Sequence, residues 1–253
     1  MILLITLRGT MTATVLTDET RSKYQRISTA SVATALYKRG LRNQFIQNVV
    51  PVQWKGRNMV GQAFTLRYIP AREDRNPITA FHNADHPQRV AVEQCPPDHV
   101  LVMDSRKDAR AASAGSILVT RLSVRGCAGI VTDGGFRDAE GIAALDMPAY
   151  FQKPSAPTNL TLHEALDLNV PISCGDVAVF PGDLMLGDGD GVMVIPRYLV
   201  EEIAEECVEM ENYEAFVLEQ VLEGQQVIGL YPPTNDAAIA LYRSWKERAA
   251  LPR

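Results

Sequence analysis

The fold is decided by residues 128–138, which read Ala128-Gly129-Ile130-Val131-Thr132-Asp133-Gly134-Gly135-Phe136-Arg137-Asp138. The first five residues form a short apolar run of the kind found in buried strands. A similar run occupies residues 100–104, and helical patterns at 111–125 and 139–145 flank the quoted strand. This alternation of strand and helix predicts an α/β architecture with a mostly buried sheet.

Further elements are predicted on both sides of this stretch. Beyond Pro171, short apolar segments are separated by turn residues at 181–183 and 187–191, which indicates tightly connected strands. Pro196 favours the start of a long helix, and Gly224 can end it. The other elements are expected as strands at 60–69 and 149–151 and as helices at 29–39, around 90–94, and at about 235–248.

Composition limits the classes of protein to which the chain can belong. With 253 residues, 46% of them apolar, it can bury one large core, and no flexible or charged linker divides it. We therefore expect a single domain over residues 1–253, with an N-terminal extension at 1–28 and a C-terminal extension at 225–253. The net charge of −5 argues against a phosphate-neutralising surface, so no nucleic acid is expected as a partner.

Cysteine usage and hydropathy favour a cytoplasmic protein. The four cysteines are scattered without zinc-like spacing, as is typical of reduced thiols in the cytosol. The apolar start, residues 1–7, is too short for a signal peptide, and no later stretch approaches transmembrane length. No association with a membrane is expected.

The pair Arg137 and Asp138 follows the end of the central strand, where ligands of α/β sheets collect. An arginine can bind a carboxylate through two parallel hydrogen bonds. An adjacent aspartate can hold a hard cation such as Mg²⁺, which commonly uses one or two carboxylates. The alternative is a sharp turn in which Arg137 and Asp138 pair with neighbours, or in which Asp138 caps the next helix.

Several segments, taken together, resemble one known family. It comprises the 4-hydroxy-4-methyl-2-oxoglutarate/4-carboxy-4-hydroxy-2-oxoadipate aldolases and the ribonuclease-activity regulator A-like proteins. The resemblance covers roughly residues 29–224. The matching segments, in chain order, are residues 61–65, 97–104, 115–118, 129–138, 181–183 and 188–196.

This resemblance implies roles for particular residues. In the aldolases, the arginine of the pair binds the pyruvyl part of the substrate, which implies that role for Arg137. The aspartate is a ligand of Mg²⁺ or Mn²⁺, which implies that Asp138 binds this metal cofactor. The substrate-binding loop corresponds to Gly115, Ser116, Ile117 and Leu118, near a helix start whose free N–H groups favour a carboxylate or enolate oxygen.

The resemblance also implies an architecture and an assembly. The family fold is an α/β/β sandwich with a swivelling-type sheet core, and we expect a long C-terminal helix. Family members form homotrimers or hexamers with sites at subunit contacts. A glutamate from a neighbour's C-terminal helix contributes to the site, and Glu211 and Glu214 are the candidates here.

One position departs from the aldolase pattern. The second loop residue is an aspartate in the aldolases, where it acts in proton transfer with a metal-bound water, and here it is Ser116. A serine without a partner is not a comparable base near neutral pH. The parts that bind a 2-oxo acid and stabilise an enolate are therefore expected, whereas the route of the proton is altered.

The sequence predicts a metal-dependent lyase that acts on a 2-oxo acid. An aldolase that releases pyruvate is the leading interpretation, and oxaloacetate decarboxylation is a related activity. A dehydratase of a sugar-derived 2-oxo acid is an alternative. Another is a ribonuclease-binding regulator, although such regulators lack the aspartate that stands here as Asp138. A scaffold with an inactive site is a third alternative, because of Ser116.

Other polar clusters have simpler interpretations. Asp188 and Asp190 alternate with glycines, but the spacing of an EF-hand does not continue, so a hairpin turn is expected. His82 and His86 precede Pro87 without a metal motif, and we interpret them as surface or loop residues. Three arginines could line a substrate entrance or belong to a solvated loop, namely Arg67, Arg72 and Arg75.

Overall fold

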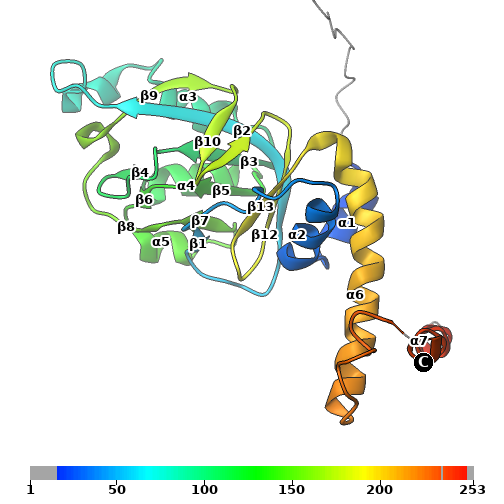
Figure 1. Ribbon diagram of the computed structural model, residues 1–253. Helices are drawn as coiled ribbons and strands as arrows, with labels where there is room; N and C mark the ends of the chain where they lie inside the picture. Colours follow the sequence, from blue (N-terminus) through cyan, green and yellow to red (C-terminus); the bar gives the residue numbers. More distant parts are fainter. Residues whose placement is uncertain (1–15, 235, 250–253) are drawn as a thin grey trace, which may run out of the picture.

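The computed structural model of the protein describes residues 16–234 and 236–249 (Figure 1). At its centre lies a mixed eight-stranded sheet with four neighbouring parallel strands. These strands are β7 (Ala149–Phe151), β5 (Gly129–Thr132), β3 (His99–Asp104) and β2 (Met59–Pro70). They are the strands that the sequence predicts, and β1 (Val50–Pro51) adds an antiparallel edge beside β7.

Strand β2 is long enough to pair with two further strands along the edge that faces away from β3. Its first half pairs with β12 (Leu184–Gly187) and its second half with β9 (His163–Leu168), both antiparallel. Strand β13 (Val192–Ile195) follows β12 through Asp188–Gly191, where the Asp188 N–H donates to the Gly191 carbonyl at 3.0 Å. The hairpin interpretation of this acidic stretch is confirmed.

Alternating side chains of β3 supply two separate layers of the core. Leu101 and Met103 pack on the side of α3 (Pro87–Gln94), α4 (Ser116–Val124) and α5 (Ala139–Ala143). Val100 and Val102 pack on the opposite side, against the hairpin of β10 (Ile172–Cys174) and β11 (Val177–Val179). Because side chains alternate across a strand, one sheet is buried between helices and further strands, and the predicted α/β/β fold is confirmed.

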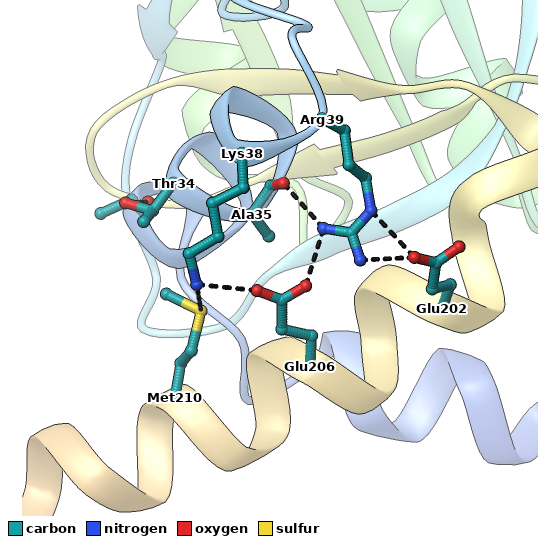
Figure 2. A network of polar contacts seen from close by, with 8 residues as sticks. Thr34, Ala35, Lys38, Arg39, Glu202, Glu206 and Met210 are labelled. Carbon is teal, nitrogen blue, oxygen red and sulfur yellow. Dashed lines mark hydrogen bonds and ion pairs between the residues drawn. The ribbon is translucent and has the colours of Figure 1, made fainter.

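A third part of the core lies under the hairpin of β12 and β13. There α1 (Asp18–Tyr24), α2 (Thr29–Lys38) and α6 (Val200–Leu222) surround apolar side chains of the sheet. Figure 2 shows α2 and α6 joined by ion pairs, in which Arg39 reaches Glu202 at 2.6 Å and Glu206 at 2.7 Å. Lys38 reaches Glu206 at 2.8 Å.

The far end of α6 extends beyond the sheet and carries α7 (Asp236–Ala249) beside it (Figure 1). A small aromatic cluster joins these two helices, with Phe216 1% exposed at its centre. We call this part of the molecule the α6–α7 arm. Three 3-10 turns complete the described elements, namely η1 (Ile78–His82), η2 (Asn159–Thr161) and η3 (Arg197–Leu199).

One predicted helix has different bounds. The pattern at 111–125 predicts a continuous helix, but residues 112–114 form strand β4 (Ala112–Ala114), and α4 begins at Ser116. The short Ala-Ser-Ala run is extended because it pairs in parallel with β6 (Gly135–Phe136).

The predictions about residues 1–7 lie outside the described residues. Among the helices that are described, none has the length and apolar character that a membrane crossing requires.

Candidate active site

The candidate site forms at the edge of a small parallel sheet made of β4, β6 and β8 (Lys153–Pro154). Because β4 and β6 run in parallel, the residues that follow them lie at the same edge. Gly115 follows β4, and Arg137 follows β6, whose chain is held by a 3.0 Å hydrogen bond from the Arg137 N–H to the Ala114 carbonyl. The two segments that the sequence singles out are therefore brought together.

A buried carboxylate fixes the loop that leads to this edge. Asp133 is fully buried and accepts hydrogen bonds from the N–H groups of Ser105 (2.6 Å), Lys107 (3.1 Å) and Gly175 (3.1 Å). Burial raises the pKa of Asp133 to about 6, and the three N–H donors partly oppose this rise. One side chain thus joins the loop after β5 to two other loops.

The glycine after Asp133 allows a close approach to buried hydroxyls. A Cβ on Gly134 would lie 2.7 Å from both Ser105 Cβ and Ser113 Oγ. Ser113 Oγ forms 2.6 Å hydrogen bonds with Ser105 Oγ and with Thr132 Oγ1, and the Gly134 N–H donates to Thr132 Oγ1 at 3.0 Å. This packing holds the backbone that precedes Arg137 in one position.

Asp138 occupies the N-cap position of α5 but makes no side-chain capping bond. Its backbone is left-handed, with φ 56°, a conformation that aspartate tolerates better than most residues. Asp138 Oδ2 accepts instead from Ser116 N (3.4 Å) and Ser116 Oγ (3.3 Å) and lies 3.7 Å from Arg137 Nε. The side-chain capping alternative is therefore wrong, whereas the alternative in which Arg137 and Asp138 pair with neighbours agrees with these contacts. The carboxylate faces the start of α4.

These residues border a cavity of about 190 Å³. Gly115 is packed against the arginine, since a Cβ on Gly115 would lie 2.7 Å from Arg137 Cγ. The side chains of Arg137 and Asp138 are 48% and 51% exposed, which leaves both of them open to a ligand. The cavity is lined by Phe81, Gln88, Arg89, Ala112, Ala114, Gly115, Ile117, Leu118, Arg137, Asp138, Thr158 and Asn159.

The predicted site residues lie together. Gly115, Ile117, Leu118, Arg137 and Asp138 line the cavity. Ser116 is not one of its lining residues, but it contacts Asp138. The predicted glutamates lie elsewhere in the same chain. Glu211 accepts from the Ser28 N–H at 2.8 Å, and Glu214 accepts from Tyr231 Oη at 2.7 Å.

Sequence reasoning missed the wall of the cavity opposite the predicted loops. This wall comes from η1 and α3, which supply Phe81, Gln88 and Arg89, and from Thr158 and Asn159. None of these residues stands in a motif or at the end of a predicted strand. The sequence signal was the helix predicted around residues 90–94, which begins one residue after Arg89.

The remaining candidate residues have structural positions. Arg67, Arg72 and Arg75 form ion pairs with Asp167, Asp74 and Glu164, respectively, and they do not line the cavity. His82 is exposed, as predicted. His86 lies in the loop before α3, as interpreted, but it is not at the surface. Its ring lies at the edge of Phe81 (centroids 5.3 Å apart), and burial lowers its pKa.

The donor set at the cavity fits a hard divalent cation. Asp138 supplies one carboxylate, it is half exposed, and it is not used as a helix cap. Mg²⁺ is often held by one or two carboxylates, with water and substrate oxygens filling the other positions. No group of three or more acidic, histidine or cysteine side chains in the described part of the chain offers a complete protein cage, so such a cation would depend on water and substrate.

The fold and the cavity define an α/β protein with a small-molecule site at the edge of parallel strands. The family model described as RraA-like, Aldolase/RraA, matches residues 29–194, and the chain belongs to this family. The resemblance inferred from residues 29–224 is thereby confirmed.

Two curated proteins illustrate the similarity of this chain to known sequences. A protein of Halalkalibacterium halodurans, provisionally named as a 4-hydroxy-4-methyl-2-oxoglutarate aldolase, is 35% identical over 117 residues, which are 46% of this chain and 55% of that relative. The chain thus spans about half the length of this curated relative. Protein DlpA of Legionella pneumophila is 24% identical over 78% of this chain and 31% of its own length.

A solved structure shares the fold. It is RraAS2 of Streptomyces coelicolor, described as an unusual member of the RNase ES inhibitor RraA protein family. The similarity has a TM-score of 0.69 and 28% sequence identity, and it covers 79% of this chain and 96% of that chain. The proteins similar to this chain therefore include one with an aldolase name and one described as a member of an RNase ES inhibitor family.

Proposed function

We propose that the protein is a divalent-metal-dependent lyase that cleaves a 2-oxo acid and releases pyruvate. The observation that carries this proposal is the position of Asp138. Its carboxylate lies at the cavity beside Arg137, contacts the start of α4, and is not used as a helix cap. The carboxylate contacts Arg137 and Ser116, but it is half exposed at the cavity and therefore remains accessible to a cation.

Arg137 binds the substrate carboxylate in this proposal. Its guanidinium can donate two parallel hydrogen bonds to a carboxylate, and its backbone is fixed by the bond to the Ala114 carbonyl. The half-exposed side chain leaves these donors accessible. Gly115 sets the position of the arginine, because any larger residue there would displace Arg137 Cγ.

Asp138 would hold Mg²⁺ or Mn²⁺. When bound, such an ion supplies Lewis-acid stabilisation of the negative charge that develops on the substrate as the carbon–carbon bond breaks. Ser116 Oγ donates a hydrogen bond to Asp138 Oδ2 at 3.3 Å. The hydroxyl therefore orients the carboxylate of Asp138. Cleavage of a 4-hydroxy-2-oxo acid requires a base that takes the proton of the substrate hydroxyl and an acid that returns a proton to the enolate carbon of the pyruvyl product. Because Ser116 is too weak a base without a partner, both transfers are assigned to water at the open side of the cavity, with no net change in protons.

The test is pyruvate release from a panel of 4-hydroxy-2-oxo acids and from oxaloacetate, with Mg²⁺ or Mn²⁺ and with EDTA. We expect pyruvate from at least one member with metal, and none with EDTA. No release across the panel would overturn the lyase proposal and direct the same assay to dehydration of sugar-derived 2-oxo acids.

A second candidate function is the binding of a ribonuclease. The similarity to RraAS2, which covers most of that chain, favours it. The two proposals separate experimentally, because a regulator lowers ribonuclease activity without any dependence on Asp138 or added metal, whereas the lyase requires both.

A further inference from the structure

Arg89 contributes a second guanidinium to the cavity from a different element than Arg137. It lies in the first turn of α3, which packs against α4, whereas Arg137 follows β6. Its Cζ lies 4.7 Å from the centroid of the Phe81 ring, which comes from η1 and also lines the cavity. This cation–π contact fixes the plane of the guanidinium and leaves its edge N–H groups free to bind.

The charge of Arg89 is not matched within the described part of the chain. Its buried Nε has no hydrogen-bond partner there, and the side chain makes no ion pair with any described residue. Arg121, by contrast, has a carboxylate partner, because it lies 2.8 Å from Glu93 of α3. The Nε atoms of Arg106 and Arg125 are also buried without a partner. Arg89 differs from them in lining the cavity, so its unpaired guanidinium is placed where a ligand can reach it.

The cavity as a whole has an excess of positive charge. Its charged lining residues are Arg89, Arg137 and Asp138, two cations and one anion. A cation bound by Asp138 would make the excess larger. The neutral wall beside Arg89 is polar, because Gln88 and Asn159 lie there and are joined by a 3.3 Å hydrogen bond. Such a lining favours a ligand with more than one negative group.

We propose that Arg89 is a specificity-determining residue that binds the distal carboxylate of a dicarboxylic 2-oxo acid. This inference rests on the proposed function, in which Arg137 holds the carboxylate of the pyruvyl end. The guanidinium of Arg89 then pairs with the carboxylate at the other end, through charge-assisted hydrogen bonds from the edge that Phe81 leaves free. The segment that carries η1 and α3 thus selects among substrates.

The experiment compares two unreactive ligands of equal carbon number. They are 2-oxoglutarate and 2-oxopentanoate, which differ in the second carboxylate, and binding is measured by calorimetry with Mg²⁺ present. We expect the unsubstituted protein to prefer 2-oxoglutarate. In Arg89→Met this preference falls roughly 10- to 100-fold, the range for the loss of charge-assisted hydrogen bonds, while 2-oxopentanoate binding is unchanged.

Two variants control for folding and for charge. Arg121→Met removes an arginine that pairs with α3 outside the cavity and should leave the preference unchanged. Arg89→Lys keeps the charge but not the planar fork, and should retain part of the preference. Circular dichroism and thermal unfolding confirm that each variant is folded.

The outcomes separate this inference from the lyase proposal. A preference for 2-oxoglutarate that depends on Arg89 supports the inference even if no substrate is cleaved. Equal binding of the two ligands by the unsubstituted protein overturns it, as does a preference that survives in Arg89→Met. Cleavage of 2-oxo acids at rates indifferent to Arg89 and to a second carboxylate would also overturn it while leaving the lyase proposal intact.

Discussion

Two regions of the molecule differ in whether their arginine side chains have carboxylate partners within the fold. Where α2 meets α6, Arg39 pairs with both Glu202 and Glu206, and its guanidinium also donates to the Ala35 carbonyl at 2.8 Å (Figure 2). At the cavity, Arg89 has no carboxylate partner among the described residues, and Arg137 has Asp138 at 3.7 Å. Charges of the first region are matched by the fold, whereas those of the second remain available to a ligand.

The largest loss of activity is expected when the carboxylate of Asp138 is removed from the cavity. Asp138→Ala should lower any lyase activity by more than about 100-fold, because the proposed metal ligand is removed. The side chain of Asp138 is half exposed and does not cap α5, but its φ of 56° suits alanine less well than aspartate. The free energy of unfolding should therefore fall by about 1 kcal/mol, and the protein should stay folded. Steady-state kinetics over a Mg²⁺ titration measure the effect, and full activity at ordinary Mg²⁺ concentrations would contradict the metal-site assignment.

A smaller loss of activity is expected when Arg137 is displaced but not removed. Gly115→Ala places a Cβ within 2.7 Å of Arg137 Cγ, so the guanidinium must shift, and a misplacement of about 1 Å can cost up to about 100-fold in rate. The matched control is Gly141→Ala, whose Cβ would meet Ser116 Cβ at an ordinary 3.4 Å. Equal kcat/KM for the two variants would argue against a positioning role for Gly115.

Asp133 makes the stability of the site region depend on pH, because it is a buried carboxylate in the segment that leads to Arg137. Its pKa is about 6 in the folded protein, against an ordinary value of 3.8. Between these values the folded state holds a proton that the unfolded state has lost, so the contribution of Asp133 to stability falls as pH rises from about 4 to 6. The fall amounts to up to about 3 kcal/mol.

The measurement is urea unfolding across this pH range for the unsubstituted protein and for Asp133→Asn. Relative to the unsubstituted protein, the variant should gain stability as pH rises, even if the loss of an acceptor for three N–H groups makes it less stable at every pH. Asp146→Asn, at a side chain that is 84% exposed, serves as the control. Parallel pH profiles for Asp133→Asn and the unsubstituted protein would contradict the shifted pKa.

The smallest effect is expected where charges are matched at the surface. Arg39→Met should lower the free energy of unfolding by about 1 kcal/mol, because partly exposed ion pairs contribute little and are screened by salt. Substrate cleavage should be unchanged, since this contact lies away from the cavity lining. Chemical denaturation at low and high salt tests this, and a loss of activity would break the distinction between the two regions.

The part of the site that could be predicted follows from local pattern. The apolar run 129–132 leads into Asp133, and strands of this kind end where ligands bind. Arg137 and Asp138 are therefore accessible from local pattern, as are the hairpin at Asp188 and the long helix α6. In each of these cases, the residues that form the sequence pattern are within a few positions of the element or side chain that the pattern predicts. The Gly115 loop is accessible only through the resemblance to a known family.

The rest depends on contacts between distant segments. Residues 112–114 have a helical composition, and they are extended because β6 offers a pairing partner. Arg89 and Asn159 meet at the cavity although 70 residues of sequence separate them. Asp138 stands where a cap is expected, but its carboxylate turns to Ser116, 22 residues earlier in the chain. No local pattern carries such information.

The long helix α6 belongs to two apolar clusters at once. Ile203, Ala204 and Cys207 pack with the sheet, whereas Phe216 and Val217 pack with α7, and Leu222, Val227 and Ile228 are between 50% and 91% exposed. Opening of the α6–α7 arm therefore breaks few of the contacts that hold the sheet. The protein is expected to have two cooperative units that share one helix, so a single midpoint of denaturation would average over both of them.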